Sequence, residues 1–277
     1  MAANLIKYSV FGGTGFVGGN FCDSFSEDVI IQKRDERIPS TKNILYFIST
    51  VDNYNVFNNI TLDVETNLKV LCEVLENCKE EGTVFNFISS WFVYGDVPLP
   101  AREEYYCKPT GFYSITKKAA EDLIISFCKT FKVEYRILRL CNVLGSGDGK
   151  VSAKKNALTY MVDCLKKNED VFLYDEGTPV RDVMHVTDVC CAIDLVCREG
   201  KLNEIYNIGS GQPTCVGDII SSARTYLNSS SEIKSKPAPE FHQIVQTKDF
   251  WMDTTKLSDL GFEQLISNDL IIKELCQ

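Results

Sequence analysis

The chain has 277 residues, 44% of them hydrophobic, so it can fill a substantial core and disorder is not expected. Its formal net charge of −9 opposes binding to nucleic acid and to anionic lipid surfaces. Twelve cysteines without a CxxC pair indicate reduced core residues, and two histidines, His185 and His242, without clustered ligands indicate no metal site.

The beginning of the chain runs directly into an apolar strand and lacks the pattern of a signal peptide. The longest apolar stretches, such as residues 44–48, are too short to cross a bilayer as a helix. We therefore expect a soluble, cytoplasmic protein with no membrane partner.

Buried strands and amphipathic helices alternate along the first 140 residues. This alternation predicts an α/β fold with a Rossmann-type, doubly wound parallel sheet. The expected strands are residues 5–11, 29–32, 44–49, 84–89 and 134–140, and the expected helices are 16–25, a segment carrying apolar positions from Val64 to Cys78, and 112–131.

The pattern changes after Asn142, where a glycine-rich turn is followed by an expected helix at 157–167 and a short strand at 171–174. A helix at 188–197 and a strand at 204–208 follow, and residues 228–239 read as a polar connection. We predict that residues 1–150 and 181–207 form the cofactor-binding domain and that residues 151–180 and 208–277 form a small C-terminal substrate lobe.

A glycine loop follows the first strand and opens the first helix. Gly12, Gly15 and Gly18 have GxxGxxG spacing, which lets backbone N–H groups approach a dinucleotide pyrophosphate at a helix N-terminus. The second strand ends at Gln32, where NAD-selective proteins of this fold carry Asp or Glu, and Lys33 and Arg34 follow. Two cations suit a 2′-phosphate, so NADP(H) is favoured over NAD(H), the alternative being that both side chains point into solvent.

Tyr113 and Lys117 lie four residues apart on an expected helix and so emerge from one face. The ammonium can lower the pKa of the phenol from about 10 and make it an acid/base near neutral pH. Ser89 and Ser90, at the end of the preceding strand, could bond the same substrate oxygen. The alternative is a packed tyrosine beside a solvated lysine.

Four motifs occur in an order that resembles the NAD-dependent epimerase/dehydratase family, the nucleotide-sugar branch of the extended short-chain dehydrogenases/reductases. They are GGTGFVG at 12–18, SSWFVYG at 89–95, YSITK at 113–117 and RDVMHVTD at 181–188. Asn67, RLCNVLGSGD at 139–148, YNIGSG at 206–211 and residues 253–262 are also family-like, so the resemblance spans nearly the whole chain.

The resemblance implies hydride transfer at a sugar carbon, with Tyr113 as acid/base, Lys117 holding the cofactor ribose and Ser90 bonding the reacting oxygen. Asn142 and Arg181 are the implied contacts to the substrate diphosphate, a salt bridge to Asp182 being the alternative for Arg181. His185 resembles a packed position at a helix start. The cofactor-binding residues assigned in this way are Gly12, Thr14, Gly15, Phe16, Val17, Gly18, Lys33, Arg34, Ser49, Thr50, Asn67, Tyr113 and Lys117.

The chain departs from this family in two places. Sugar 4,6-dehydratases carry acidic residues directly after the catalytic Ser or Thr, whereas Trp91 and Phe92 stand here and cannot move a proton. Only about eleven residues separate the second strand from Ile44, too few for the usual helix and third strand, so one βα unit is expected to be missing. The second strand would then lie at the sheet edge, which puts the adenine contacts in doubt.

Three functions remain open. Reduction of a nucleotide-linked 4-keto sugar is favoured through the expected NADP(H), 4-epimerisation with retained NAD is the second candidate, and a non-catalytic cofactor-binding regulatory protein is the third. The family resemblance also implies a homodimer formed through the helices that carry residues 68–75 and 123–131.

Overall fold

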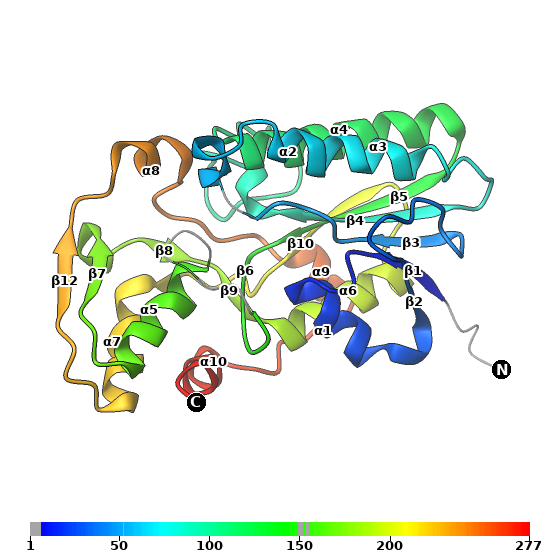
Figure 1. Cartoon of the computed structure of the whole chain (residues 1–277). Helices are drawn as coiled ribbons and strands as arrows, with labels where there is room; N and C mark the ends of the chain where they lie inside the picture. Colours follow the sequence, from blue (N-terminus) through cyan, green and yellow to red (C-terminus); the bar gives the residue numbers. More distant parts are fainter. Residues whose placement is uncertain (1–6, 52, 149–151, 153–155) are drawn as a thin grey trace.

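Six parallel strands form the central sheet of the protein (Figure 1). The computed structural model describes residues 7–51, 53–148, 152 and 156–277. Across the sheet the strands follow the order β10 (Glu204–Ile208), β5 (Glu134–Leu140), β4 (Val84–Ser90), β3 (Asn43–Tyr46), β1 (Tyr8–Phe11) and β2 (Val29–Ile31). The predicted doubly wound sheet is therefore confirmed; residues 5 and 6 of the expected first strand lie outside the described residues.

Helices cover both faces of this sheet (Figure 1). One face carries α2 (Leu62–Val64), the π-helical turn η3 (Glu65–Lys69), α3 (Val70–Leu75) and α4 (Phe112–Phe131), and the other carries α1 (Phe16–Ser24) and α6 (Val186–Glu199). Side chains alternate along each strand, so Ile44 and Tyr46 pack under α3 and α4 while Leu45 packs on the α1 and α6 side. Burial of both faces explains why these strands read as continuous apolar runs.

Strand β2 is the last strand on its side of the sheet. It pairs with β1 alone, with Val10 opposite Ile31, and the chain then passes to β3 on the other side of β1. The expected absence of one βα unit is thus confirmed. Ile30 and Ile31 are exposed at this edge.

A smaller lobe packs against the carboxyl end of the sheet. Its core joins α5 (Ala157–Lys166), α7 (Val216–Leu227) and α10 (Asn268–Leu275). The remaining elements are β6 (Asn142–Leu144) paired with β9 (Val183–His185), β8 (Val180–Arg181) with β11 (Thr214–Cys215), β7 (Val171–Tyr174) with β12 (Ile233–Lys236), the helices α8 (Glu240–Val245) and α9 (Thr255–Asp259), and the 3₁₀ turns η1 (Ser26–Asp28), η2 (Asn53–Phe57), η4 (Trp91–Val93) and η5 (Asp175–Gly177).

Residues 228–239 were predicted to be a polar connection, and this prediction was wrong because part of the segment is a strand. They contain β12, whose residues run parallel to β7 with Lys236 opposite Tyr174. Three of its four residues are exposed, so the sequence carries no apolar alternation and only the pairing with β7 makes it a strand.

The twelve cysteines form no disulfide, and nine of them are buried. Within the described part of the chain, no helix has the length and apolar character needed to cross a membrane.

Candidate active site

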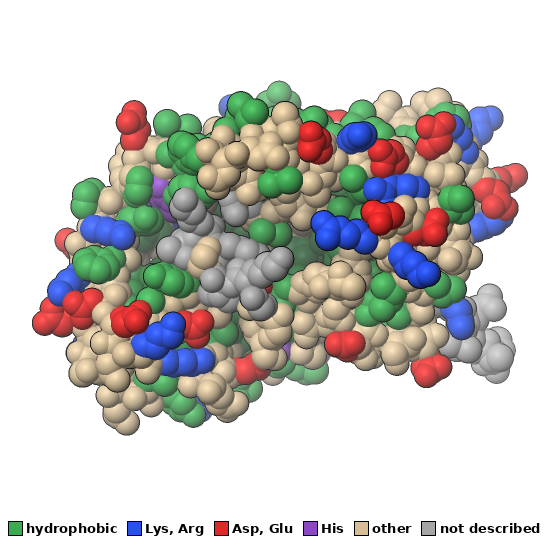
Figure 2. Space-filling view, viewed as in Figure 1, with side chains coloured by type: hydrophobic (Ala, Val, Ile, Leu, Met, Phe, Trp, Pro, Cys, Tyr) green, Lys and Arg blue, Asp and Glu red, His purple; other side chains and the backbone are tan. Residues whose placement is uncertain are grey.

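A pocket of about 960 Å³ opens at the carboxyl ends of the strands and is lined by both lobes. In the space-filling view it is the dark, largely hydrophobic hollow near the centre of the molecule (Figure 2). Crevices at this edge of an open parallel sheet are the usual ligand sites of such folds. Of the predicted site residues, it gathers Gly12, Gly15, Phe16, Val17, Gly18, Ser49, Thr50, Ser90, Tyr113, Lys117, Asn142 and Arg181.

Glycine is required at two positions of the glycine loop. Gly12 has a φ of +84°, and a Cβ there would lie 2.9 Å from the backbone nitrogen of Ile48. A Cβ at Gly18 would lie 2.4 Å from the carbonyl oxygen of Gly12, so the helix approaches the loop as closely as glycine permits. Gly15 caps α1 without any side-chain bond, which leaves N–H groups of the first turn able to bind an anion. Thr14 is exposed and does not line the pocket.

Asn67 lies behind the pocket wall. Its amide oxygen accepts hydrogen bonds from the Thr50 backbone N–H at 2.8 Å and the Ser49 hydroxyl at 3.2 Å, and its amide nitrogen donates to Thr50 Oγ1 and Thr116 Oγ1, both at 2.9 Å. Both polar atoms of the side chain are therefore engaged by protein. The contacts support a role in holding the Ser49–Thr50 segment, which itself lines the pocket.

Ser89 and Ser90 end β4 on opposite faces. The Ser89 hydroxyl donates to Glu121 Oε1 at 2.6 Å. Ser90 Oγ accepts the Phe92 backbone N–H at 3.3 Å and caps the turn η4. Since the Ser89 hydroxyl proton is used internally, Ser90 is the serine better placed to bond a ligand.

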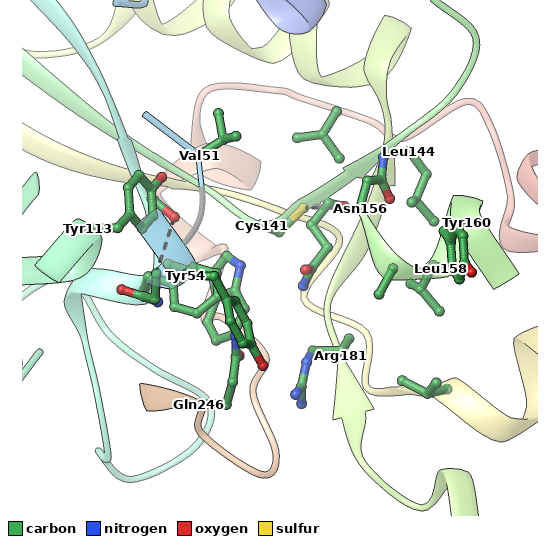
Figure 3. Close-up of a pocket in the computed structure, with 18 of the residues that line it drawn as sticks. Val51, Tyr54, Tyr113, Cys141, Leu144, Asn156, Leu158, Tyr160, Arg181 and Gln246 are labelled. Carbon is green, nitrogen blue, oxygen red and sulfur yellow. Dashed lines mark hydrogen bonds between the residues drawn. The ribbon is translucent and has the colours of Figure 1, made fainter. Parts of the chain in front are cut away.

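Tyr113 stands at the start of α4 beside an aromatic wall. The Phe92 ring meets the Tyr113 ring edge-on with 5.8 Å between centroids, and Trp91 stacks on Phe92 at 4.0 Å. Figure 3 shows Tyr113 and Tyr54 on one side of the pocket and Leu158 and Tyr160 on the other. Neither Trp91 nor Phe92 has an ionisable side chain, so the wall beside Tyr113 supplies no acid or base.

Lys117 is buried one helical turn beyond Tyr113, with 2% of its surface exposed. Its Nζ donates to the Ile88 carbonyl oxygen at 2.6 Å and lies 4.0 Å from the centre of the Phe87 ring. Burial lowers the pKa of Lys117 from 10.5 to about 7, and the carboxylate of Glu121 partly opposes this shift.

We predict that Lys117→Met stabilises the fold while removing a site group. An apolar side chain avoids the cost of burying an ammonium, so the free energy of unfolding at pH 7 should rise by about 1–3 kcal/mol. The folded-state pKa is below the unfolded one, so the gain is full at and below pH 7 and vanishes towards pH 10.5, where lysine is neutral in both states. Urea unfolding of wild type and Lys117→Met between pH 7 and pH 10.5 measures this difference in the free energy of unfolding.

The control is Lys118→Met. Lys118 is more exposed and pairs with Asp122 one turn along the same helix. It should change stability little and without this pH dependence, and equal gains for the two variants would contradict the assigned cost of burial at Lys117.

Arg181 enters the pocket from β8 (Figure 3). Its Nη1 donates to the carbonyl oxygens of Val180, at 2.8 Å, and Lys248, at 2.5 Å, and its guanidinium carbon lies 5.6 Å from the Trp91 ring. Burial lowers its pKa to about 10. Among the described residues no carboxylate forms an ion pair with it, and Asp182 instead accepts hydrogen bonds from the backbone of Ser210, Gly211 and Met252.

Asn142 lies near Arg181 on the same wall. Its amide nitrogen donates to the Asp182 carbonyl oxygen at 3.1 Å. This bond fixes the side chain at the pocket surface.

His185, in contrast, is buried and caps α6, with Nδ1 accepting the Thr187 N–H and Nε2 lying 2.9 Å from Glu274.

Lys33 and Arg34 follow the edge strand β2 and lie outside the pocket lining. Both are exposed, and neither forms an ion pair within the residues the structure describes. The next cation, Arg37, differs because it binds Glu73 at 2.7 Å. The end of β2 nevertheless adjoins the glycine loop, since a Cβ on Gly13 would lie 3.1 Å from Ile31 Cγ2.

Sequence reasoning missed a second group of pocket residues. Tyr54 Oη lies 3.3 Å from His242 Nδ1, and the Tyr174 ring lies 4.8 Å from the His242 ring. The pKa of His242 is lowered by burial and then by the positive charge of Arg181. These residues come from η2, β7 and α8, and no spacing in the sequence links them.

Comparisons with known proteins show which family the chain is similar to. The profile of the NAD dependent epimerase/dehydratase family matches residues 38–209. A putative UDP-glucose 4-epimerase of Methanocaldococcus jannaschii is 26% identical, over 92% of this chain and 92% of its own length.

Solved structures share the fold. The crystal structure of UDP-glucose 4-epimerase from Thermotoga maritima with UDP-glucose superposes with a TM-score of 0.85, at 23% identity over 97% of this chain and 98% of its own. RMD from Pseudomonas aeruginosa complexed with NADPH superposes with a TM-score of 0.81, at 20% identity over 98% of both chains.

Proposed function

The chain belongs to the NAD-dependent epimerase/dehydratase family, and from this premise we propose that it transfers hydride between a nicotinamide cofactor and the sugar of a nucleotide-linked substrate. The observation that carries the proposal is that Ser90, Tyr113 and Lys117 line the same pocket as the glycine loop and Arg181. Cofactor and substrate groups can thus meet within one cavity that both lobes enclose.

The residues of the pocket fit a dinucleotide. Gly12 and Gly18 let the loop pack closely against the end of β3 and against α1, and Gly15 caps α1, where the pyrophosphate would lie against the N–H groups of the first turn. The cofactor supplies the hydride. Lys117 would hold its ribose, and Ser49 and Thr50 would line its path between the loop and the nicotinamide end.

In the proposed reaction Tyr113 exchanges a proton with the reacting sugar oxygen while Ser90 donates a hydrogen bond to the same oxygen. The Lys117 ammonium, one turn away on α4, favours the ionised phenol. Arg181 and Asn142 would bind the substrate diphosphate, since the Arg181 guanidinium retains N–H groups that no carboxylate of the described residues occupies.

Reduction of a 4-keto sugar is our first candidate and 4-epimerisation our second. Lys33 and Arg34, unpaired in the described structure at the end of β2, support NADP(H), and exchange with a reduced NADP pool favours delivery of hydride in one direction. The similarity to 4-epimerases favours the second candidate, in which the hydride leaves and returns. A non-catalytic role is third, because the site residues are intact.

Turnover of a panel of nucleotide sugars, ordinary hexoses and 4-keto sugars, with NADH and NADPH supplied separately, tests the proposal. We expect consumption of NADPH with a 4-keto substrate. Interconversion of C4 epimers without net consumption of cofactor would place the second candidate first, and no turnover with any substrate would leave only the non-catalytic role.

The same panel tests a negative prediction. No 4-keto-6-deoxy sugar should form from any nucleotide hexose, because Trp91 and Phe92 occupy the wall beside Tyr113 and neither can remove the C5 proton or protonate the departing hydroxyl. Mass spectrometry detects the loss of water. Its appearance at a rate near that of the main reaction would contradict this assignment.

We also propose a homodimer. Helices α3 and α4 run side by side on the outer face of the sheet (Figure 1). Leu123 and Phe131 of α4 are exposed, as is Val64 of α2, which precedes α3 on the same face. Pairing of these two helices with their symmetry mates would bury the exposed apolar side chains in a four-helix bundle.

A further inference from the structure

Helix α4 carries a third ionisable group in line with the two already assigned. Tyr113, Lys117 and Glu121 follow one another at four-residue intervals, so they share one buried face of the helix. Glu121 has no exposed surface. A fully buried carboxylate is costly unless its oxygens are paired, so its contacts indicate what holds it there.

Two partners satisfy Glu121. Arg139, on β5, binds it in a forked pair, with Nε 3.0 Å from Oε1 and Nη2 2.8 Å from Oε2. The Ser89 hydroxyl donates to Oε1 at 2.6 Å. Because Ser89 immediately precedes Ser90, this bond fixes the end of β4 from which Ser90 faces the pocket.

Lys117 has few charged neighbours. Its own helix presents Tyr113 and Glu121, and β4 presents the Phe87 ring and the Ile88 carbonyl oxygen. The positive charge of Arg139, on β5, is bound to Glu121. Among the residues that the structure describes, Glu121 is the carboxylate whose charge favours the ammonium against the cost of burial. Without the Glu121 carboxylate, burial would lower the pKa of Lys117 further and favour the neutral amine.

We propose that Glu121 is a positioning residue of this site: its carboxylate holds the proton on Lys117 in the neutral pH range and, through Ser89, anchors the strand end that carries Ser90. This inference rests on the proposed function, because the charge on Lys117 matters to the reaction only if it tunes Tyr113 and binds the cofactor ribose. Glu121 itself does not touch the substrate.

The charge on Lys117 is measurable without turnover. Lysines labelled with ¹³C at Cε are titrated by NMR in the full-length protein, and Lys117→Met identifies the Lys117 resonance. In Glu121→Gln the titration midpoint of Lys117 should fall by about one pH unit or more, because the opposing negative charge is gone. An unchanged or higher midpoint would overturn the proposal.

The matched control is Glu103→Gln. Glu103 is also buried, but its carboxylate accepts the Asn207 backbone N–H, and Arg139 contacts only its backbone carbonyl oxygen. Its removal should leave the Lys117 midpoint in place. An equal fall in both variants would show a general effect of losing a buried carboxylate and would also overturn the proposal.

Glu121→Gln leaves Arg139 buried without its partner, and this variant can fail to fold. The double variant Glu121→Gln with Arg139→Met removes both charges and keeps the core neutral. The Lys117 midpoint should still fall, because the Glu121 carboxylate is the charge that favours the ammonium and Arg139 lies on another element, β5. A midpoint equal to that of wild type would refute the role.

The pH profile of turnover provides the second readout. The alkaline limb that reports loss of the Lys117 proton should move to lower pH in Glu121→Gln by the same interval as the NMR midpoint. If wild type turns over no nucleotide sugar, the proposed function fails, while the NMR titration still decides what Glu121 does to Lys117.

Discussion

Tyr113→Phe is expected to lower kcat by about 10²–10⁴-fold, the usual contribution of a positioned general acid or base. The substitution deletes one oxygen and leaves the ring, which packs edge-on against Phe92 in a largely buried position. The wall of the pocket is therefore kept, and the dissociation constant of the nicotinamide cofactor should stay within about twofold of the wild-type value, since no packing is lost. Steady-state rates and fluorescence titration of the reduced cofactor measure the two quantities.

Tyr106→Phe is the matched control, because Tyr106 is 81% exposed and lies outside the pocket lining. It should leave both quantities unchanged. Near-wild-type turnover in Tyr113→Phe would reject the acid/base role and with it the proposed reaction, whereas loss of cofactor binding would mean that the hydroxyl contacts the cofactor rather than the sugar.

Periodicity predicted the parts of this molecule in which apolar residues repeat with the period of a strand or a helix. The alternation of apolar strands and amphipathic helices predicted the sheet, and the short segment between β2 and β3 correctly predicted that β2 lies at the edge. Four-residue spacing predicted that Tyr113 and Lys117 share a face, and both line the pocket. These signals are local consequences of helix and strand geometry.

Other features depend on contacts between distant segments. Strand β12 exists because β7 pairs with it, and the meeting of Tyr54 with His242 joins residues 188 positions apart. The family motif favoured Ser90 over Ser89, but the reason that Ser89 is engaged, its bond to Glu121 on another element, could not be read from the sequence. Glu121 did carry a signal, as a carboxylate four residues after Lys117, but its burial became visible only with Arg139 beside it.

The edge position of β2 bears directly on cofactor choice. A further strand outside β2 would bring other residues close to the side chains that follow β2. No such strand is present in the described sheet, and Lys33 and Arg34 are exposed. Gln32 has no charge, and its amide nitrogen donates to Ser40 Oγ at 3.1 Å. No acidic side chain therefore ends this strand to accept bonds from the ribose hydroxyls of NAD, and the two exposed cations that follow it are the basis of the proposed preference for NADP(H).

Replacing Lys33 by Asp and Arg34 by Asn is expected to weaken NADPH binding by about 100-fold or more, since two charge-assisted phosphate contacts are lost and one repulsive charge is added. NADH binding should change by less than about threefold, because NADH lacks the 2′-phosphate. Titration calorimetry of both cofactors with wild type and the double variant measures this difference. Arg37→Asn is the control, because Arg37 already pairs with Glu73 and should not discriminate between the cofactors. Tighter binding of NADH than NADPH by the wild type would reject the assignment, and because the preference for reduction rests on NADP(H), 4-epimerisation would then become the first candidate.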